Sequence, residues 1–432
     1  MSGDPIRPSE RPPIDVDERR RLGERLHVFT QVFEPPLGND SGPTFAVKDL
    51  IDVAGVPTGG GGKVPLATCP AAHATVVQRL LDAGYGAVGK THTVELAFGG
   101  WGTNRAVGAP WNPWDAKVRR APGGSSSGSA VAVAAGLCDV ALGTDTGGSV
   151  RIPAAASGVV GLKPGRGLVP TRGVHDLAPS LDTVGTLARS VPEAARMLAA
   201  ISGPDGGSAR RGPFDAEAAL ATQVGGGRVA ALPLEAMPTV HPDIAELYRQ
   251  TLTRLEALGV KVEPAVTPRP FSDYFLPNGW LMSAEGWRVR GAHIQAHGEE
   301  MDPWVRQRFE AGRGVSDAEL AGAQAQRAEA QARFGAWMAP YAALVSPTAP
   351  IPAPPIAEVD ETVSPFSALT RAANYLDLPA ASVPMGLTRE GLPAGFQIMG
   401  RTGDEATVVA LAAAFERLSG WNGRMPDLSG FA

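Results

Sequence analysis

Apolar residues recur along the chain at helical spacing in some segments and form short uninterrupted runs in others. The helical spacing predicts a surface helix over residues 15–33 and an amphipathic helix over 72–84, and a run of small residues predicts a helix over 129–136. Short apolar runs bounded by glycine or proline predict strands at 44–55, 85–90, 138–145 and 159–164. Because helices alternate with short strands, the predicted fold class is α/β with a parallel or mixed sheet.

The second half of the chain has two parts of different character. Residues 205–345 are richer in Arg, Ala and Glu and predict a variable helical insertion, with aromatic residues clustered at 270–287. After it, "ALVSPTAP", "PAASVPMG" and "AGFQIMG" predict strands, and "EATVVALAAAFERL" predicts a helix. The chain contains no internal repeat and no convincing linker. We therefore expect a flexible Pro-rich tail at 1–13 and a single domain over 14–432.

Composition and charge exclude several classes of protein. The 432 residues are 44% hydrophobic and 19% charged, which is enough for a large core. The 39 basic and 44 acidic residues are mixed along the chain, and the absence of a basic cluster argues against nucleic acid as a partner. The first residues lack a secretory apolar region, and no run of 18 uncharged apolar residues occurs. We therefore expect a cytoplasmic protein that does not enter a membrane.

The two cysteines, Cys69 and Cys138, lie far apart and in no spacing typical of a metal site. They are predicted to be small buried apolar residues in a reducing compartment.

The motif "GYGAVGKT" at 84–91 matches the spelling of a phosphate-binding loop. Such a loop must leave a strand and open a helix, so that the amides at the start of the helix surround the phosphate. Here the motif follows a predicted helix, and its middle residues are those of a predicted strand. Nucleotide binding is thus an alternative function of a different class, with the wrong structural context.

Two further motifs also lack their expected context. "GSSSG" at 124–128 matches a serine-hydrolase elbow centred on Ser126, but no buried strand precedes it, and the last histidine of the chain is His297. "HIQAH" at 293–297 lacks the glutamate that a metalloprotease needs after its first histidine. No metal site is predicted, and these histidines are expected on the surface.

The segment "ALGTDTGGSVRIPAAASG" at 141–158 has features of a catalytic turn. A buried strand is followed by the sharp "TGGS" turn and a short helix. In that turn the amides of Thr146, Gly147 and Gly148 can converge into a nest of N–H donors, because glycine permits the backbone angles required. Ser149 places a hydroxyl beside this nest. Acyl transfer needs that pairing of a nucleophile with donors at the point where oxyanion charge develops.

At this point the chain resembles a known family. "PGGSSSGSA" at 122–130, "GTDTGGSVRIPA" at 143–154 and "VKDLIDVAG" at 47–55 are similar to the three landmarks of the amidase signature enzymes. The similarity runs from about residue 44 to 200 and again from about 344 to 417. It implies the fold of that family, a central mixed β-sheet covered by helices on both faces.

The resemblance also implies a Ser–cis-Ser–Lys triad. Carried over residue by residue, Ser149 is the nucleophile, Ser125 the bridging serine and Lys48 the base. The peptide bond between Gly124 and Ser125 is then expected to be cis. The chain departs from the family at Ser127, which stands where a glycine is usual and is expected to alter local packing but not the triad.

Lysine acts as a base only when it is neutral. The pKa of Lys48 should be lowered by burial among its apolar neighbours Phe45, Val47, Leu50 and Ile51. Asp49 should point to the opposite face of the strand, because side chains alternate there. Asp145 and Arg151 flank the nucleophile and are predicted to form a structural ion pair.

The substrate is less well specified by the sequence. "ELAFGGWGTN" at 95–104 should border the pocket, with Ala97, Gly100 and Trp101 as candidate lining residues. The aromatic-rich segment 269–287 falls in the family's variable region and favours an apolar or aryl acyl pocket, unless its rings only pack the insertion. No metal or organic cofactor is expected.

The predicted function is hydrolysis of a carboxylic amide C–N bond through an acyl-enzyme on Ser149, with a small-molecule amide as substrate. Carbamates or esters are further substrates that the family accepts, and a homodimer is left open. The nearest alternative is the glutaminase subunit of a tRNA-dependent amidotransferase, which would need partner subunits.

Overall fold

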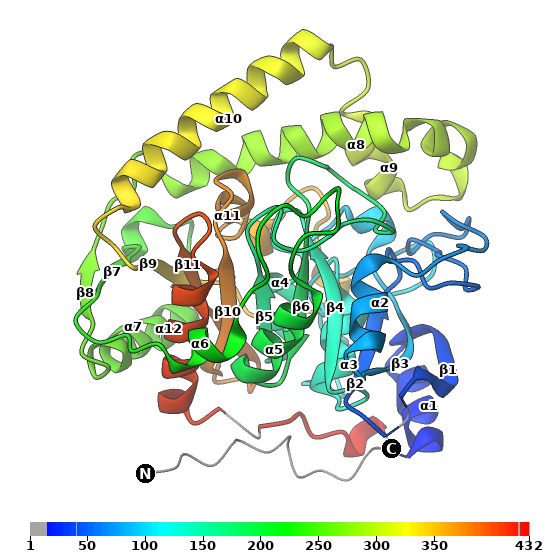
Figure 1. The fold of residues 1–432 in the computed structure, drawn as a ribbon, viewed down its shortest axis with the longest axis horizontal. Helices are drawn as coiled ribbons and strands as arrows, with labels where there is room; N and C mark the ends of the chain where they lie inside the picture. The colour runs from blue at the N-terminus through cyan, green and yellow to red at the C-terminus, as the bar shows by residue number, and fades with distance from the viewer. Residues whose placement is uncertain (1–14, 40, 422–423, 432) are drawn as a thin grey trace.

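The structure is a computed structural model that describes residues 15–39, 41–421 and 424–431. The predicted tail at 1–13 lies outside the described residues. In the part that is described, eleven strands form one mixed sheet in the order β1-β3-β2-β4-β6-β5-β10-β11-β9-β7-β8 (Figure 1). Their bounds are β1 (Phe29–Gly38), β2 (Thr44–Lys48), β3 (Gly86–Thr91), β4 (Val140–Asp145), β5 (Val160–Lys163), β6 (Thr183–Ala188), β7 (Arg228–Ala231), β8 (Lys261–Pro264), β9 (Ala343–Pro347), β10 (Ala380–Leu387) and β11 (Pro393–Gly400).

Parallel pairing is confined to two parts of the sheet, where β2 lies between β3 and β4, and where β7 lies between β8 and β9. The pairs in between and the β1–β3 pair are antiparallel. Parallel neighbours place their carboxyl ends at the same edge of a sheet. Lys48 at the end of β2 and the turn after β4 are therefore brought to one edge.

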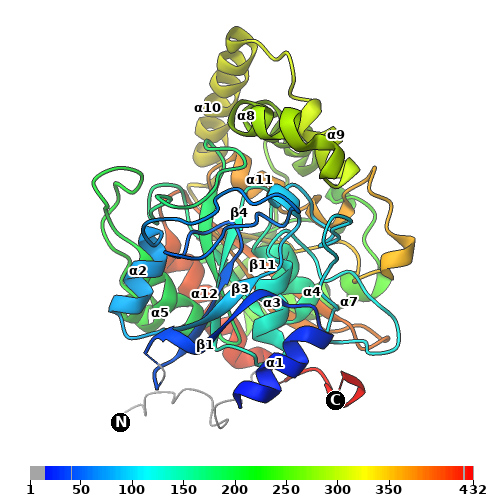
Figure 2. The same cartoon turned by 90° about the vertical axis from the view of Figure 1, so that its right-hand side faces the viewer.

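Twelve α-helices surround the sheet. Their bounds are α1 (Val16–Arg25), α2 (Thr75–Asp82), α3 (Ser127–Ala134), α4 (Arg151–Ser157), α5 (Val191–Ile201), α6 (Ala216–Ala221), α7 (Pro242–Glu256), α8 (Phe275–His297), α9 (Pro303–Glu310), α10 (Asp317–Met338), α11 (Arg371–Tyr375) and α12 (Glu405–Ser419) among the described residues. Helices α2, α5, α6 and α12 cover one face of the sheet, and α3 and α4 cover the other (Figures 1 and 2). The predicted α/β class with helices on both faces is confirmed.

Most of the predicted elements are present within a few residues of their expected bounds. One prediction is wrong, because the expected helix over 15–33 ends at Arg25 and is followed by the edge strand β1. In β1 the half-buried residues are 29, 32, 33, 36 and 37, a spacing that imitates a helix. The cause is the irregular pairing of β1 with β3, whose register shifts twice and changes which side chains face the protein. Strand β6 was not predicted.

The cysteine prediction is right for Cys138 and wrong for Cys69. Cys138 is buried next to β4, and burial raises the pKa of its thiol to about 12. Cys69 is exposed. It lies in a stretch of bends rather than in a helix or strand, so its side chain has no layer to pack against.

Residues 205–345 supply helices α6 to α10 and also the strands β7 and β8 at the edge of the main sheet. Helices α8, α9 and α10 form a layer at one end of the molecule (Figures 1 and 2). The side chain of Asn278 on α8 donates from Nδ2 to the carbonyl of Thr146 at 3.4 Å, so this layer lies directly over the turn that follows β4. None of the described helices combines the length and apolar character needed to cross a membrane.

Candidate active site

Lys48 occupies the last position of β2 and is completely buried. Its Nζ donates to Ser125 Oγ at 2.7 Å and to Thr144 Oγ1 at 2.7 Å. The four apolar neighbours named from the sequence are each no more than 1% exposed. Lys48 therefore has two hydroxyl partners and an apolar surround, with no carboxylate in direct contact.

Burial lowers the pKa of Lys48 to about 7, although the negative charges of Asp145 and Asp182 act in the opposite direction. Asp49, the carboxylate next in the chain, points elsewhere and pairs with Lys90 Nζ at 2.8 Å. An ordinary lysine is neutral in roughly one molecule in a few thousand at pH 7, and the lowered pKa makes the neutral form of Lys48 far more common. Lys48 is thus able to accept a proton near neutral pH.

Ser125 lies in the loop that precedes α3, and the peptide bond from Gly124 to Ser125 is cis. Its carbonyl accepts hydrogen bonds from Val94 N at 3.1 Å and from Thr93 Oγ1 at 2.9 Å. These bonds hold the backbone of the loop while the Ser125 hydroxyl accepts from Lys48. The glycine- and serine-rich stretch is therefore a rigidly held loop within the core and not a linker.

Ser149 lies in the turn between β4 and α4 and is buried, with 7% of the residue exposed. Its carbonyl accepts from Ser126 N at 3.1 Å, which ties the two serine motifs together. No hydrogen bond within 3.5 Å joins Ser125 Oγ to Ser149 Oγ in the structure. Such bonds are often long without a substrate and shorten when one is bound.

One backbone N–H of the turn after β4 is bonded to a carboxylate, and three others are free. Gly148 N donates to Asp145 Oδ1 at 2.7 Å, so this predicted oxyanion donor is already occupied. The N–H groups of Thr146, Gly147 and Ser149 have no acceptor among the described residues. Gly148 itself has a φ of +127°, and a Cβ there would collide with Thr370 Oγ1. Glycine is required at this position for the turn, and the free donors lie on either side of it.

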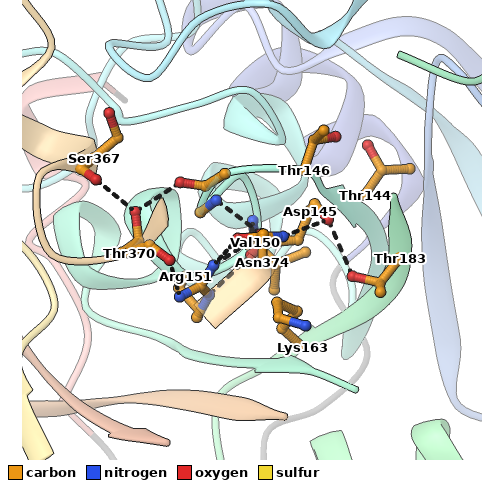
Figure 3. Close-up of polar contacts among 12 residues, drawn as sticks. Thr144, Asp145, Thr146, Val150, Arg151, Lys163, Thr183, Ser367, Thr370 and Asn374 are labelled. Carbon is orange, nitrogen blue, oxygen red and sulfur yellow. Dashed lines mark hydrogen bonds and ion pairs between the residues drawn. The ribbon is translucent and has the colours of Figure 1, made fainter. Parts of the chain in front are cut away.

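A buried ion pair holds the turn in place. Arg151 donates to Asp145 through Nη2 at 2.9 Å and Nε at 3.0 Å, and both side chains are fully buried (Figure 3). Arg151 also donates to Asn374 Oδ1 at 2.6 Å and to Gln397 Oε1 at 2.6 Å. Although burial opposes ionisation of the Asp145 carboxyl, the Arg151 guanidinium keeps the pKa of Asp145 well below its usual range. The predicted structural ion pair is confirmed.

Replacing Arg151 with methionine is expected to destabilise the protein by about 3–5 kcal/mol, because the Asp145 carboxylate would stay buried without its partner. The measurement is the urea midpoint of unfolding. The control is Arg196→Met, since Arg196 pairs with Glu217 at 2.8 Å on the surface, where such a pair contributes less than about 1 kcal/mol. If the two substitutions lowered stability equally, the Arg151–Asp145 pair would not have the structural role assigned to it.

The three residues predicted to line the substrate pocket lie beside the serine loops. The carbonyl of Gly100 accepts from Gly124 N at 2.9 Å, and that of Trp101 accepts from Gly123 N at 3.1 Å. Ala97 borders the same small cavity as Thr144 and Thr146. Trp101 is only 4% exposed, its indole N–H donates to the carbonyls of Asp360 and Val363, and its ring packs against Phe366.

Two rings of the aromatic segment pack the insertion, and a third is partly exposed. Phe271 and Tyr274 are buried, and Tyr274 lies near Phe334 and Tyr375, so these rings pack the added layer of helices. Phe275 lies partly exposed at the start of α8.

Sequence reasoning did not identify four residues of the site. Thr144 is the second partner of Lys48, and Asp182 accepts from Thr146 Oγ1 at 2.5 Å. Desolvation raises the pKa of Asp182 to about 7. Asn278 and Arg371 reach the turn from α8 and α11. The position of Thr144 inside "GTDTGGS" was a usable signal, whereas the other three lie in stretches without a motif.

Ser127 is the residue at which the chain departs from the family pattern. It begins α3, and its buried hydroxyl has no hydrogen-bond partner. An unsatisfied buried hydroxyl costs roughly 1–3 kcal/mol.

Ser127→Ala is therefore expected to leave stability unchanged or to raise it by about 1 kcal/mol, with activity retained. Chemical denaturation of the two proteins measures the difference. The matched control is Ser129→Ala, which removes bonds to Leu142 O at 2.9 Å and to Thr91 Oγ1 at 2.8 Å and should destabilise. A clear loss of stability in Ser127→Ala would show that its hydroxyl has a partner.

The motif "GYGAVGKT" has no phosphate-loop geometry. Its residues 86–91 form β3, and Lys90 is buried with its Nζ on Asp49 and Thr58. His293 and His297 lie on α8 with ring centroids 5.1 Å apart. In the part of the chain that the structure describes, no group of three or more metal-ligating side chains occurs.

Comparisons with known proteins agree with this geometry. A sequence model of the family described as Amidase matches residues 36–409. The chain is 33% identical over 445 residues to a glutamyl-tRNA(Gln) amidotransferase subunit of Chloroflexus aggregans, across 96% of this chain and 88% of that protein. The solved counterpart of that subunit from Thermotoga maritima is 31% identical with a TM-score of 0.80, across 94% of this chain and 91% of that one. A 6-aminohexanoate cyclic dimer hydrolase, solved with its substrate, is 25% identical with a TM-score of 0.85, across 95% and 93%.

Proposed function

Because the chain belongs to the amidase signature family, we propose that it cleaves the C–N bond of a carboxylic amide through an acyl-enzyme on Ser149. The observation that carries the proposal is the buried amine of Lys48, which is 2.7 Å from Ser125 Oγ and titrates near neutral pH. A lysine in that state is a base, and the adjoining serine loops supply a hydroxyl and free backbone donors.

The proposed reaction has two halves. Ser149 Oγ attacks the amide carbonyl carbon, and its proton passes through Ser125 Oγ to Lys48 Nζ. The carbonyl electron pair becomes an oxyanion near the free N–H groups of the turn, Thr146, Gly147 and Ser149. When it collapses, the C–N bond breaks and the leaving nitrogen takes the proton back along the same path. Water then cleaves the Ser149 ester by the same relay and releases the carboxylic acid.

The comparisons favour one form of this activity. The relatives at 31–33% identity are subunits of glutamyl-tRNA(Gln) amidotransferases, and they match nearly the whole chain. We therefore propose the side-chain amide of glutamine as the first candidate substrate, with ammonia as the released product and partner subunits as the natural context. We expect the chain to act in the cytoplasm and to need no cofactor.

A free-standing amidase acting on a small amide is the second candidate. The cyclic dimer hydrolase favours it, because that enzyme has the same fold over nearly the same length. The two candidates share the reaction at Ser149 and differ in the acyl group.

The test is a hydrolysis screen of the purified chain alone, with the released ammonia or amine quantified. The substrates are glutamine, a neutral aliphatic amide, an aryl amide and a carbamate. Ammonia from glutamine that disappears in Ser149→Ala supports the first candidate. Faster cleavage of a neutral amide than of glutamine supports the second, and no release from any of the four substrates contradicts amide hydrolysis.

A further inference from the structure

Arg371, the first residue of α11, forms no ion pair with any described residue. Among the described residues, no carboxylate lies within 4.0 Å of its guanidinium. A guanidinium carries five N–H donors, and in this part of the chain the only acceptor of Arg371 is the carbonyl of Phe275, at 3.2 Å. The guanidinium carbon lies 3.9 Å from the centroid of the Phe275 ring. Most of the donors of Arg371 are therefore unused.

Other arginines of this region are satisfied. Arg308 is paired with Glu361 at 2.6 Å and also donates to the carbonyl of Phe98. Arg327 has no carboxylate contact but donates to three backbone carbonyls, those of Tyr375, Ser180 and Asn374. Arg371 differs from both in having neither an ion pair nor a set of carbonyls.

The surroundings of Arg371 make its charge costly. Desolvation and, to a smaller extent, the positive charge of Arg308 lower the pKa of Arg371 to about 10. Arg371 is only partly buried, so water reaches part of its surface, and an anion that replaced this water would gain a charge-assisted contact. A bound anion would pair with this guanidinium and use its free N–H donors.

The side chain of Arg371 passes directly over the oxyanion turn. A Cβ placed on Gly147 would lie 3.4 Å from Arg371 Cγ, and one placed on Gly279 would lie 2.7 Å from Arg371 Nη1. The side chain thus runs from the turn, where the substrate carbonyl is expected, to the first two turns of α8. The guanidinium therefore lies against α8, and the stem of the side chain lies beside Gly147.

Asn278 provides a second and independent sign of a ligand. This residue is fully buried, and its Oδ1 has no hydrogen-bond partner. The same Oδ1 would lie 3.2 Å from a Cβ on Gly147, so the unpaired acceptor lies beside the turn and close to the Arg371 side chain. Buried amide oxygens are usually hydrogen-bonded. A ligand with both an anionic group and an N–H would satisfy the two residues together.

We propose that Arg371 and Asn278 form a subsite for a carboxylate-bearing amide, in which Arg371 binds the carboxylate and Asn278 Oδ1 accepts an N–H of the same molecule. The inference rests on the proposed function, since it names the substrate class of the same reaction. Arginine binds a carboxylate through two parallel N–H···O bonds, which fixes orientation as well as charge. The substrate class is a short acid with an amide at its far end, such as glutamine or the monoamide of a dicarboxylic acid.

The test compares two amides of the same shape. Glutaramate carries a carboxylate where pentanamide carries a methyl group, so the ratio of their kcat/KM values measures the contribution of the anion. The wild type should favour glutaramate by about 10- to 100-fold, the range expected for charge-assisted hydrogen bonds. Arg371→Gln should remove the preference, because it should raise KM for glutaramate by a larger factor than it changes kcat/KM for pentanamide. Arg371→Lys should retain part of the preference for glutaramate, because lysine keeps the positive charge but lacks the two parallel N–H donors of the guanidinium.

The control is Arg333→Gln, since Arg333 is 53% exposed on α10 and should leave both substrates unaffected. Far-UV circular dichroism and the melting temperature verify that each variant folds. Equal loss of kcat on both amides in Arg371→Gln would overturn the proposal, because it would mean that Arg371 maintains the conformation of the turn and does not bind the carboxylate. A wild type without preference for glutaramate would overturn it as well.

A binding measurement separates this inference from the proposed function. Glutarate and pentanoate are the acids that the two amides would yield, and calorimetry measures their binding without turnover. Glutarate should bind the wild type at least about tenfold more tightly than pentanoate, and Arg371→Gln should abolish the difference. Pentanamide hydrolysis without preferential glutarate binding would overturn the subsite and leave amide hydrolysis intact. Glutarate binding without hydrolysis of any amide would support the subsite and contradict the proposed function.

Discussion

Ser149→Ala is expected to reduce amide turnover by at least about 10³-fold, to the level left by binding and backbone donors alone. The reason is the position of Ser149 in the turn after β4, beside the free amides of Thr146 and Gly147. Alanine removes the attacking oxygen without disturbing these amides, so the fold should remain. The measurements are kcat/KM and the intact mass of the protein mixed with substrate, which should show an acyl adduct on the wild type alone.

The matched control is Ser126→Ala. Ser126 is the centre of the "GSSSG" pattern, but its buried hydroxyl contacts the backbone N and O of Thr144 at 3.3 Å and faces no cleft. This variant should keep activity within about tenfold and show the adduct. If Ser149→Ala stayed within tenfold of the wild type and Ser126→Ala lost turnover, the nucleophile would be assigned to the wrong serine.

Replacement of Lys48 should have an effect of similar size and should also change the pH profile. Lys48 must be neutral to accept a proton, and its pKa is lowered to about 7. In the wild type, kcat/KM should therefore be low below pH 6, rise through a single ionisation near pH 7 and reach a plateau above about pH 8. Lys48→Ala and Lys48→Arg should both lose about 10³-fold or more and lack this rise, since arginine does not deprotonate.

A second variant tests whether the rise belongs to Lys48. The charge of Asp182 raises the pKa of Lys48, so Asp182→Asn should move the rise to lower pH while the plateau is maintained. Asp182→Asn keeps the shape of the side chain that Thr146 Oγ1 contacts. A rise that stays near pH 7 in this variant would mean that another group titrates, and near-normal rates in Lys48→Arg would remove lysine from the role of base.

Much of the site could be predicted from contiguous stretches of the sequence. The two serine motifs and "VKDLIDVAG" identify Lys48, Ser125 and Ser149 by resemblance, and the apolar neighbours of Lys48 predict its burial without any structure. The predicted burial of Lys48 is confirmed, while the triad stays a prediction; both were accessible from sequence because the turns and strands are specified locally, by glycines at required angles and by apolar residues that enter the core.

The sequence was less reliable where pairing modifies a local pattern. The apolar spacing of β1 imitates a helix because two register shifts against β3 change which residues face inward. Likewise, Gly148 was predicted as an oxyanion donor, yet its amide is taken by Asp145, whose position follows from the buried contact with Arg151. For β1 the deciding partner lies in another strand, whereas for Gly148 it is a side chain of the same motif whose direction the sequence pattern does not specify.

The sequence by itself determined the α/β class and the candidate triad, because both are encoded in residues that are near neighbours in the chain. Only the tertiary structure brought Asp182, Asn278 and Arg371 to the turn after β4, from positions far along the chain. Their effects depend on distance and desolvation: the charge of Asp182 acts on Lys48, and Arg371 is left without an anion. Coulomb energy and burial depend on separation in space, and the spacing of residues in a sequence does not specify that separation.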